Sequence, residues 1–118
     1  MKRYFAVLLF LSCPAQADEW TRADSIREAG YMMFHVADWG QTRNIANNPD
    51  KFQERNPLLG KHPSIKRVDT HFVVGALVHI GVAYILPRTT REAFQYVTTS
   101  FEAAVVFNNN RVGLRLDF

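Results

Sequence analysis

The feature that most constrains this chain is the run from Phe72 to Leu86, which is almost wholly apolar and ends at Pro87. Ser64 upstream is a favourable N-cap, so a helix is predicted from Ser64 to Leu86. At 1.5 Å per residue this helix is ~33 Å long, enough to cross the hydrocarbon core of a membrane without being required to. The β-branched residues of the run would also suit a strand, but its length without a turn signal favours a helix.

A second helix is predicted upstream, from Thr21 to Asn47. Thr21 and Asp24 have the spacing of a capping box, in which two side chains satisfy free backbone donors at the start of a helix. The helix should stop at Asn47, because Pro49 cannot continue the hydrogen-bond pattern. One face carries an apolar stripe that predicts packing against another helix, and the stripe comprises Ile26, Ala29, Met33, Ala37 and Gly40.

A third helix should begin directly after the turn at Pro87 and Arg88. Thr89 and Glu92 repeat the capping-box spacing, and the helical pattern continues to about Asn108. Because the turn between them is short, the second and third helices should form an antiparallel helical hairpin.

The remaining segments complete the predicted fold. Residues 111–118 alternate apolar and polar side chains, which predicts a short C-terminal extended tail with the period of a half-buried strand. A terminal Phe after such alternation is also typical of outer-membrane barrels, but one segment cannot make a barrel. The connector from Asn48 to Pro63 contains three prolines and should be an ordered loop. The sequence therefore predicts an all-α, three-helix protein.

The N-terminus has the three parts of a secretory signal peptide. Basic Lys2 and Arg3 precede an apolar run from Tyr4 to Leu11, and Ala15 and Ala17 supply the small residues that a signal peptidase reads. Residues 1–17 are therefore predicted to be a signal peptide, and residues 18–118 a single helical membrane-associated domain.

Two alternatives to a cleaved signal stay open. Ser12 and Cys13 would suit a lipoprotein signal, in which the cysteine accepts the lipid, and the leader could also remain as an uncleaved anchor. Cys13 is the only cysteine of the chain. With the leader removed, the protein would have no thiol for a disulfide, a metal site or a nucleophile.

Charge narrows the range of partners and locations. Without the leader, twelve Lys and Arg residues face eleven Asp and Glu residues, so nucleic acid is not a predicted partner. Membrane lipid, another envelope protein, or both are predicted. Residues 43–67 hold six basic residues against two acidic ones, an excess that usually stays on the cytoplasmic side of a spanning protein. We expect export to the inner membrane or the periplasm-facing envelope. A periplasmic bundle lying against the membrane suits the mean hydropathy of −0.15 equally well.

Ionisable residues within the apolar helices are the first candidates for chemistry, because an unpaired charge is costly in hydrocarbon. In the predicted hairpin, Glu102 lies at a depth between His71 and His79, so a buried pair of Glu102 with a histidine is expected. Such a pair would act as an acid and a base, or it would only lock the helices together, with Thr98 or Thr99 as alternative partners.

His35 and Asp38 form a second candidate pair. They lie three residues apart and share a helical face with Thr42, a spacing that can hold a metal ion or position a base. The sequence supplies no clear third ligand, so neither a metal nor a cofactor is predicted, and none of the familiar phosphate-binding or nucleophile motifs occurs. The candidate catalytic residues are thus His35, Asp38, His71, His79 and Glu102.

Two motifs carry a resemblance to known sequences: DWGQT at 38–42 and ERNPLLGKHPS at 54–64. Through them the chain resembles an uncharacterised family of small exported or membrane proteins of proteobacteria and their phages. The likeness extends loosely over most of the mature chain. It implies an envelope location and a helical architecture but no activity; a phage origin would imply lysis control or superinfection exclusion.

These observations predict a small exported, membrane-associated envelope protein with a non-catalytic interaction or accessory role. The alternative is a small membrane hydrolase that acts on a lipid-linked substrate, with the five candidate residues gathered around one pocket. The sequence leaves the oligomeric state open.

Overall fold

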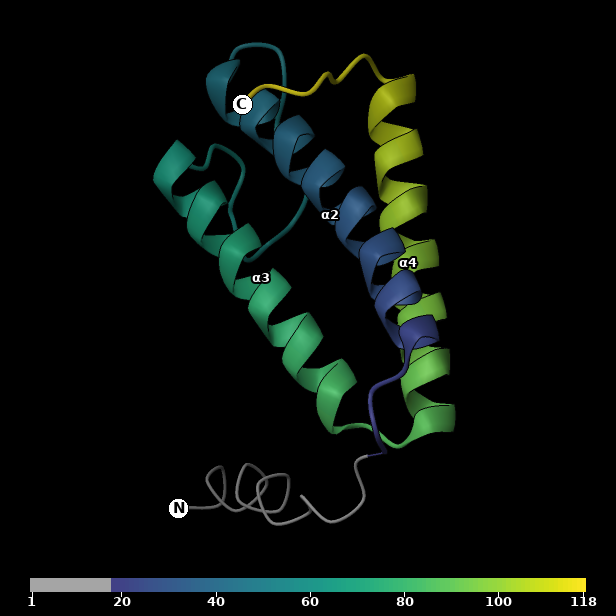
Figure 1. The fold of residues 1–118 in the computed structure, drawn as a ribbon. Coiled ribbons are helices and arrows are strands. Elements are labelled where there is room, and N and C mark those ends of the chain that lie inside the picture. The colour runs from purple at the N-terminus through teal and green to yellow at the C-terminus, as the bar shows by residue number, and fades with distance from the viewer. Residues whose placement is uncertain (1–17) are drawn as a thin grey trace, which may run out of the picture.

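The computed structural model describes residues 18–118, so the predicted signal peptide and Cys13 lie outside the described range. Three helices make up the described chain: α2 (Arg22–Asn47), α3 (Ile65–Ile85) and α4 (Arg88–Arg111) (Figure 1). No strand occurs between residues 18 and 118. The prediction of an all-α protein with three helices is confirmed.

Local side-chain hydrogen bonds begin the first two helices as the sequence predicts. The Thr21 hydroxyl accepts the Asp24 backbone N–H at 3.2 Å, and the Asp24 carboxylate accepts the Thr21 N–H at 2.8 Å, which completes a capping box. Ser64 caps α3 by accepting the Arg67 N–H at 3.1 Å. Both helices end where proline follows, α2 at Asn47 and α3 at Ile85.

The start of α4 differs from the prediction. The helix begins at Arg88 with Pro87 as its N-cap, and no side chain of its own forms a capping hydrogen bond. The carboxylate of Asp18 instead accepts the backbone N–H of Arg88. The predicted capping box at Thr89 is therefore wrong, because a residue distant in the sequence supplies the acceptor.

The helices are arranged around α2. In Figure 1, α3 and α4 leave the short link at Pro87 and diverge, and α2 lies along both of them. α2 packs extensively against α4 and α3, whereas α3 and α4 contact each other little. The bundle is therefore held together mainly through α2, and not through direct packing of α3 on α4.

The C-terminal residues do not form the predicted strand. Residues 112–118 have no regular secondary structure, and no strand within 18–118 is present to pair with them. They pass over α2, where Leu114 is buried and the Asp117 N–H donates to the carbonyl of Gly40 at 3.1 Å. A Cβ at Gly40 would lie 2.6 Å from the Phe118 ring, so glycine is what allows this close approach.

The connector folds back onto the helices as predicted. Leu59 and Pro63 are buried, and the Glu54 N–H donates to the Lys61 carbonyl at 2.9 Å. Gly60 adopts a φ of 79°, a left-handed conformation that glycine adopts readily. The connector thus forms an ordered cover at the end of the bundle opposite the Pro87 link (Figure 1).

Many polar side chains are buried in the bundle beside apolar residues such as Ile45, Val68 and Phe72, and many large apolar side chains are exposed. Most of the apolar stripe expected to pack against another helix faces outward: Ile26 is 64% exposed and Met33 is 73% exposed, and only Gly40 at the end of the stripe is buried. Charged or polar residues are buried instead, and they are Asp24, Glu28, His35, Gln41, Thr42, His79, Arg91 and Gln95. The predicted packing face of α2 was wrong because its apolar side faces outward.

We call one surface the apolar belt. It is formed by the exposed side chains of residues 26–36 of α2, 73–85 of α3 and 93–107 of α4. No exposed residue in these segments is charged. The belt includes large side chains such as Leu77, Val97 and Phe101, which are 65%, 68% and 68% exposed. Its polar Ser100 donates its hydroxyl to the Tyr96 carbonyl at 2.8 Å, so that this group is satisfied within the helix.

Candidate functional site

Two stripes of polar side chains, one on α2 and one on α4, face each other inside the bundle. Polar side chains on α2 recur at steps of four and three residues, a spacing that keeps them on one side of the helix, and they are Asp24, Glu28, Tyr31, His35, Asp38 and Thr42. The same spacing on α4 gives Arg91, Gln95, Thr98 and Glu102, and Asn109 follows seven residues later on the same side. Contacts between the two stripes divide into two clusters with different properties.

The closed cluster lies near the Pro87 link and consists of Asp24, Glu28, His79, Arg91 and Gln95. Arg91 is fully buried, and each of its five N–H donors has an acceptor. One bond goes to the Asp24 carboxylate at 2.9 Å, and two go to the carbonyls of Ala83 and Tyr84 in the last turn of α3. Arg91 therefore neutralises a buried charge and satisfies backbone groups that the end of a helix leaves free.

The Asp24 carboxylate is held in its ionised form. Burial alone would raise the pKa of Asp24, but hydrogen bonds from Thr21 and Arg91 outweigh burial and lower this pKa to about 2. Asp24 lies in the first turn of α2, outside the apolar belt, and also pairs with Arg27.

His79 pairs with Glu28, whereas the sequence predicted a pair of Glu102 with His71 or His79. Nδ1 of His79 lies 2.6 Å from Oε1 of Glu28, and Nε2 lies 2.7 Å from the Thr98 hydroxyl. The second carboxylate oxygen of Glu28 accepts a hydrogen bond from Gln95 at 2.9 Å. The prediction failed because α2, which supplies Glu28, lies beside both α3 and α4. Every ionisable group of the closed cluster thus has a direct partner.

Tyr31 separates the two clusters. Its ring stacks on the His79 ring at 3.4 Å between centroids, and its hydroxyl lies 3.3 Å from Nδ1 of His35. Nε2 of His35 donates to the Phe72 carbonyl at 2.8 Å, which fixes the ring against α3. Gly75 makes this approach possible, because a Cβ there would lie 3.3 Å from the His35 ring.

The open cluster consists of His35, Asp38 and Glu102 and lies toward the connector. Nδ1 of His35 lies 4.0 Å from Oε1 of Glu102, a weak contact at the limit of an ion pair. Oε2 of Glu102 is buried and has no hydrogen-bond partner among residues 18–118. The Asp38 carboxylate accepts only long hydrogen bonds, from Thr42 at 3.4 Å and Asn109 at 3.3 Å. The carboxylates of this cluster therefore have weak hydrogen-bond partners or none.

The electrostatic environment of Asp38 is unfavourable for a negative charge. Asp38 lies beyond the apolar belt, toward the connector. Burial raises the pKa of its carboxyl to about 7, and the nearby negative charges of Glu102 and Glu54 act in the same direction. At neutral pH, Asp38 is thus a group that can either hold or release a proton.

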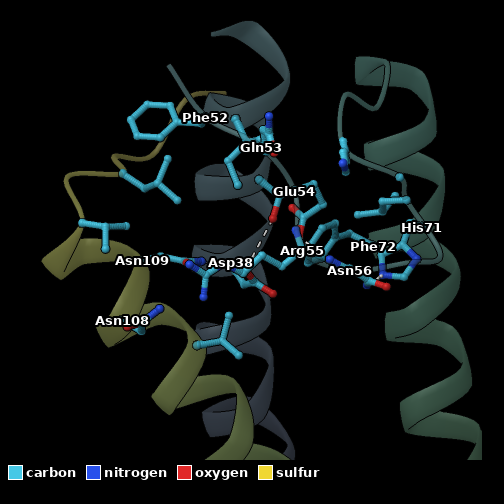
Figure 2. A pocket seen from close by; sticks show the side chains of 18 of the residues that line it. Asp38, Phe52, Gln53, Glu54, Arg55, Asn56, His71, Phe72, Asn108 and Asn109 are labelled. Carbon is cyan, nitrogen blue, oxygen red and sulfur yellow. Dashed lines mark hydrogen bonds between the residues drawn. The ribbon is translucent and has the colours of Figure 1, made fainter. Parts of the chain in front are cut away.

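A cavity of about 1240 Å³ opens beside the open cluster. α2 contributes His35 and Asp38 to its wall, α4 contributes Glu102 and Asn109, and further lining residues come from these two helices, from α3, from the connector and from the C-terminal tail. Figure 2 shows Asp38 inside this cavity with Asn108 and Asn109 on one side and Asn56 and His71 on the other. Asn56 Nδ2 lies 3.4 Å from Nε2 of His71. The cavity joins polar groups from all three helices and the connector.

The structure brings together four of the five predicted site residues. His35, Asp38, His71 and Glu102 line the cavity, whereas His79 is buried in the closed cluster. Sequence reasoning missed Asp24, Glu28, Arg91 and Gln95. The signal that could have found them is the matching polar stripe on α2 and α4, at steps of four and three residues.

No group of three or more potential metal ligands occurs among residues 18–118. Comparison of the chain with family models, curated proteins and solved structures gives no match. The arrangement of the side chains is therefore the basis for assigning a function.

Proposed function

We propose that this chain is a small exported protein of the bacterial envelope that is embedded in the membrane and has a non-catalytic interaction or accessory role. The observation that carries the proposal is the distribution of polarity. Charged side chains are buried in the bundle, and the three segments of the apolar belt expose no charge. This is the arrangement expected of helices in lipid, where polar groups must find partners inside the protein.

Water is a poor environment for this surface. Leaving one large apolar side chain exposed to water forgoes ~1.5–3 kcal/mol of burial energy, and soluble monomers rarely expose apolar patches beyond a few hundred Å². α3 is the one helix within 18–118 that is long and apolar enough to cross a membrane, and only 22% of its most apolar window is buried in the bundle. A helix that formed the core of a soluble protein would be mostly covered.

The direction of insertion follows from the connector. Its excess of Lys and Arg favours the cytoplasmic side of the inner membrane. α3 and α4 would then cross as an antiparallel hairpin with the Pro87 link on the periplasmic side, and α2 would enter from the periplasm after cleavage of the leader. The C-terminal extended tail would lie beside the connector.

The interaction role rests on the closed cluster and the belt. Buried groups that satisfy one another hold helices in place and leave nothing to react. The belt, in contrast, is a large surface for lipid or for the helix of another envelope protein. If the gene is phage-borne, lysis control and superinfection exclusion are roles of this kind.

Fractionation of the expressed protein tests the location. We expect the protein to remain in the membrane pellet after alkaline carbonate extraction, and the mass of its mature form to correspond to a chain that begins at Asp18. A protein released into the carbonate supernatant, or a cytosolic form that retains Met1, would contradict the proposal.

The cavity favours a second candidate function, a membrane hydrolase. Four of the five predicted catalytic residues line one cavity, and Asp38 there has a pKa of about 7, which suits a group that accepts a proton from an attacking water. Incubation with a phospholipid in mixed micelles, followed by mass spectrometry, would detect hydrolysis. Loss of the product with Asp38→Asn in a folded protein would support an enzyme, and the absence of any product would leave the interaction role.

A further inference from the structure

We propose that the cavity beside the open cluster binds a primary ammonium group, carried by a lipid headgroup or by a soluble amine. This proposal goes beyond the membrane location. If the protein inserts in the membrane but binds no ammonium, the proposed location stands and the ammonium site is refuted.

Each acidic group in the closed cluster has a direct partner. Asp24 pairs with Arg91 at 2.9 Å, and Glu28 pairs with His79 at 2.6 Å. In the open cluster, Asp38 and Glu102 lie close enough to influence each other, and Glu54 of the connector adds a third negative charge nearby. Their closest positive group is His35, at 4.0 Å from Glu102. The open cluster is therefore short of a cation.

No lysine or arginine within 18–118 forms an ion pair with Asp38 or Glu102. The Lys and Arg side chains that line the cavity are Lys51, Arg55 and Lys61, all exposed residues of the connector. A buried carboxylate without a cation is costly. Oε2 of Glu102 is buried and has no hydrogen-bond partner among residues 18–118, so this acceptor lacks a donor when Asp38 is ionised.

An ammonium group would supply both the positive charge and the hydrogen-bond donors that the open cluster lacks. It carries one positive charge and three N–H donors. Acceptors are available on Glu102 and Asp38, and the side-chain carbonyls of Asn108 and Asn109 line the same cavity. A quaternary ammonium has the charge but lacks the N–H donors, so it should bind less well.

The walls of the cavity suit a ligand with an apolar portion. Phe101, Val105 and Val112 line it on the side of α4, and Phe101 and Val112 are also exposed at the surface, with 68% and 56% of their area accessible. Asp38 lies two residues beyond the α2 segment of the belt. The exposed connector lysines could contact a phosphate, which makes phosphatidylethanolamine a suitable probe.

The test uses the mature protein in detergent. Native mass spectrometry would compare binding of dioleoyl phosphatidylethanolamine with that of dioleoyl phosphatidylcholine, and calorimetric titration with n-butylammonium chloride would test a soluble amine. Binding of both probes supports the proposal. If phosphatidylethanolamine binds better than phosphatidylcholine and n-butylammonium does not bind, the ligand is a lipid headgroup. If only n-butylammonium binds, the ligand is a soluble amine. Equal binding of the two lipids with no binding of n-butylammonium would overturn the proposal.

Two variants distinguish the cavity from general attraction to acidic groups. Glu102→Gln keeps the size of the side chain and removes the charge, so the affinity for the preferred probe should fall at least about tenfold. Glu92→Gln is the matched control, because Glu92 is an exposed carboxylate on the same helix and outside the cavity; its affinity should be unchanged. An equal loss in both variants, or no loss in Glu102→Gln while circular dichroism shows a folded protein, would contradict the site.

Discussion

The two polar clusters are built from the same kinds of side chain but differ in how completely those side chains are paired. The closed cluster combines two acidic residues with Arg91, His79 and Gln95, and every charge has a partner at hydrogen-bonding distance. The open cluster combines Asp38 and Glu102 with His35 alone, and it faces a cavity. A fully paired cluster stabilises the bundle, whereas an incompletely paired one beside a cavity is available for a ligand or a proton.

The largest effect is expected when the closed cluster loses its arginine. Arg91→Leu would leave the fully buried Asp24 with Arg27 as its remaining ion-pair partner and free the carbonyls of Ala83 and Tyr84, so we expect a loss of ~3–5 kcal/mol of unfolding free energy. Unfolding of the protein in detergent, followed by circular dichroism, would measure it. Arg88→Leu is the control, because Arg88 is exposed on the same turn. Similar stability of the two variants would show that the closed cluster is not structural.

A smaller loss is expected from the histidine of the closed cluster. His79→Leu removes the donor to Oε1 of Glu28 but leaves the bond from Gln95, so the free energy of unfolding should fall by ~1–3 kcal/mol. The same unfolding assay applies, with His62→Leu in the exposed connector as the control. A higher unfolding free energy in His79→Leu would show that the pairing of His79 with Glu28 does not stabilise the bundle.

The open cluster should make stability depend on pH. The pKa of Asp38 is raised to about 7 in the folded protein, from an ordinary value of 3.8, so ionisation disfavours the fold. Stability should therefore rise as the pH falls from 8 toward 5, because the folded protein takes up a proton that the unfolded chain does not. Asp38→Asn should reduce this rise. The unfolding free energy of both proteins across this range would measure it, and identical pH profiles would refute the role of Asp38.

The smallest change in stability is expected for Glu102. Its Oε2 has no partner, so Glu102→Gln removes a poorly compensated charge and should change the unfolding free energy by less than ~1 kcal/mol, with a gain as the expected sign. The matched change in the closed cluster is Glu28→Gln, which should be destabilising because Glu28 is paired with His79. If Glu102→Gln lost more unfolding free energy than Glu28→Gln, the open cluster would be the more stabilising of the two, which would contradict the roles assigned to them.

Local signals in the sequence were sufficient to predict the helices. The capping residues Thr21 and Ser64 and the prolines after α2 and α3 act within a few residues, so their effects can be recognised without knowledge of the fold. The start of α4 was mispredicted because Asp18, far away in the sequence, provides the cap. The expected C-terminal strand did not form, because the alternating residues pack over Gly40 without a partner strand.

The inward face of α2 could not be predicted from apolar periodicity. Its apolar stripe looked like a packing face under the rule for proteins in water, but Ile26 and Met33 point outward. For the same reason the predicted pair of Glu102 with His71 or His79 was wrong, since the approach of Glu28 to His79 depends on the position of α2 between the other helices. The clustering of His35, Asp38, His71 and Glu102 around one cavity was expected only under the enzyme alternative.

Accessibility of the apolar belt in native membranes tests the central claim most directly. Single cysteines would be introduced in a Cys13→Ser background at Met33, Leu77 and Val97 in the belt, and at Leu58 in the connector as the exposed control. Our account predicts that a water-soluble maleimide labels Leu58→Cys in opened membrane vesicles and labels the three belt positions only after denaturation. Labelling of the belt positions as fast as Leu58→Cys would mean that the belt faces water, and it would contradict the account.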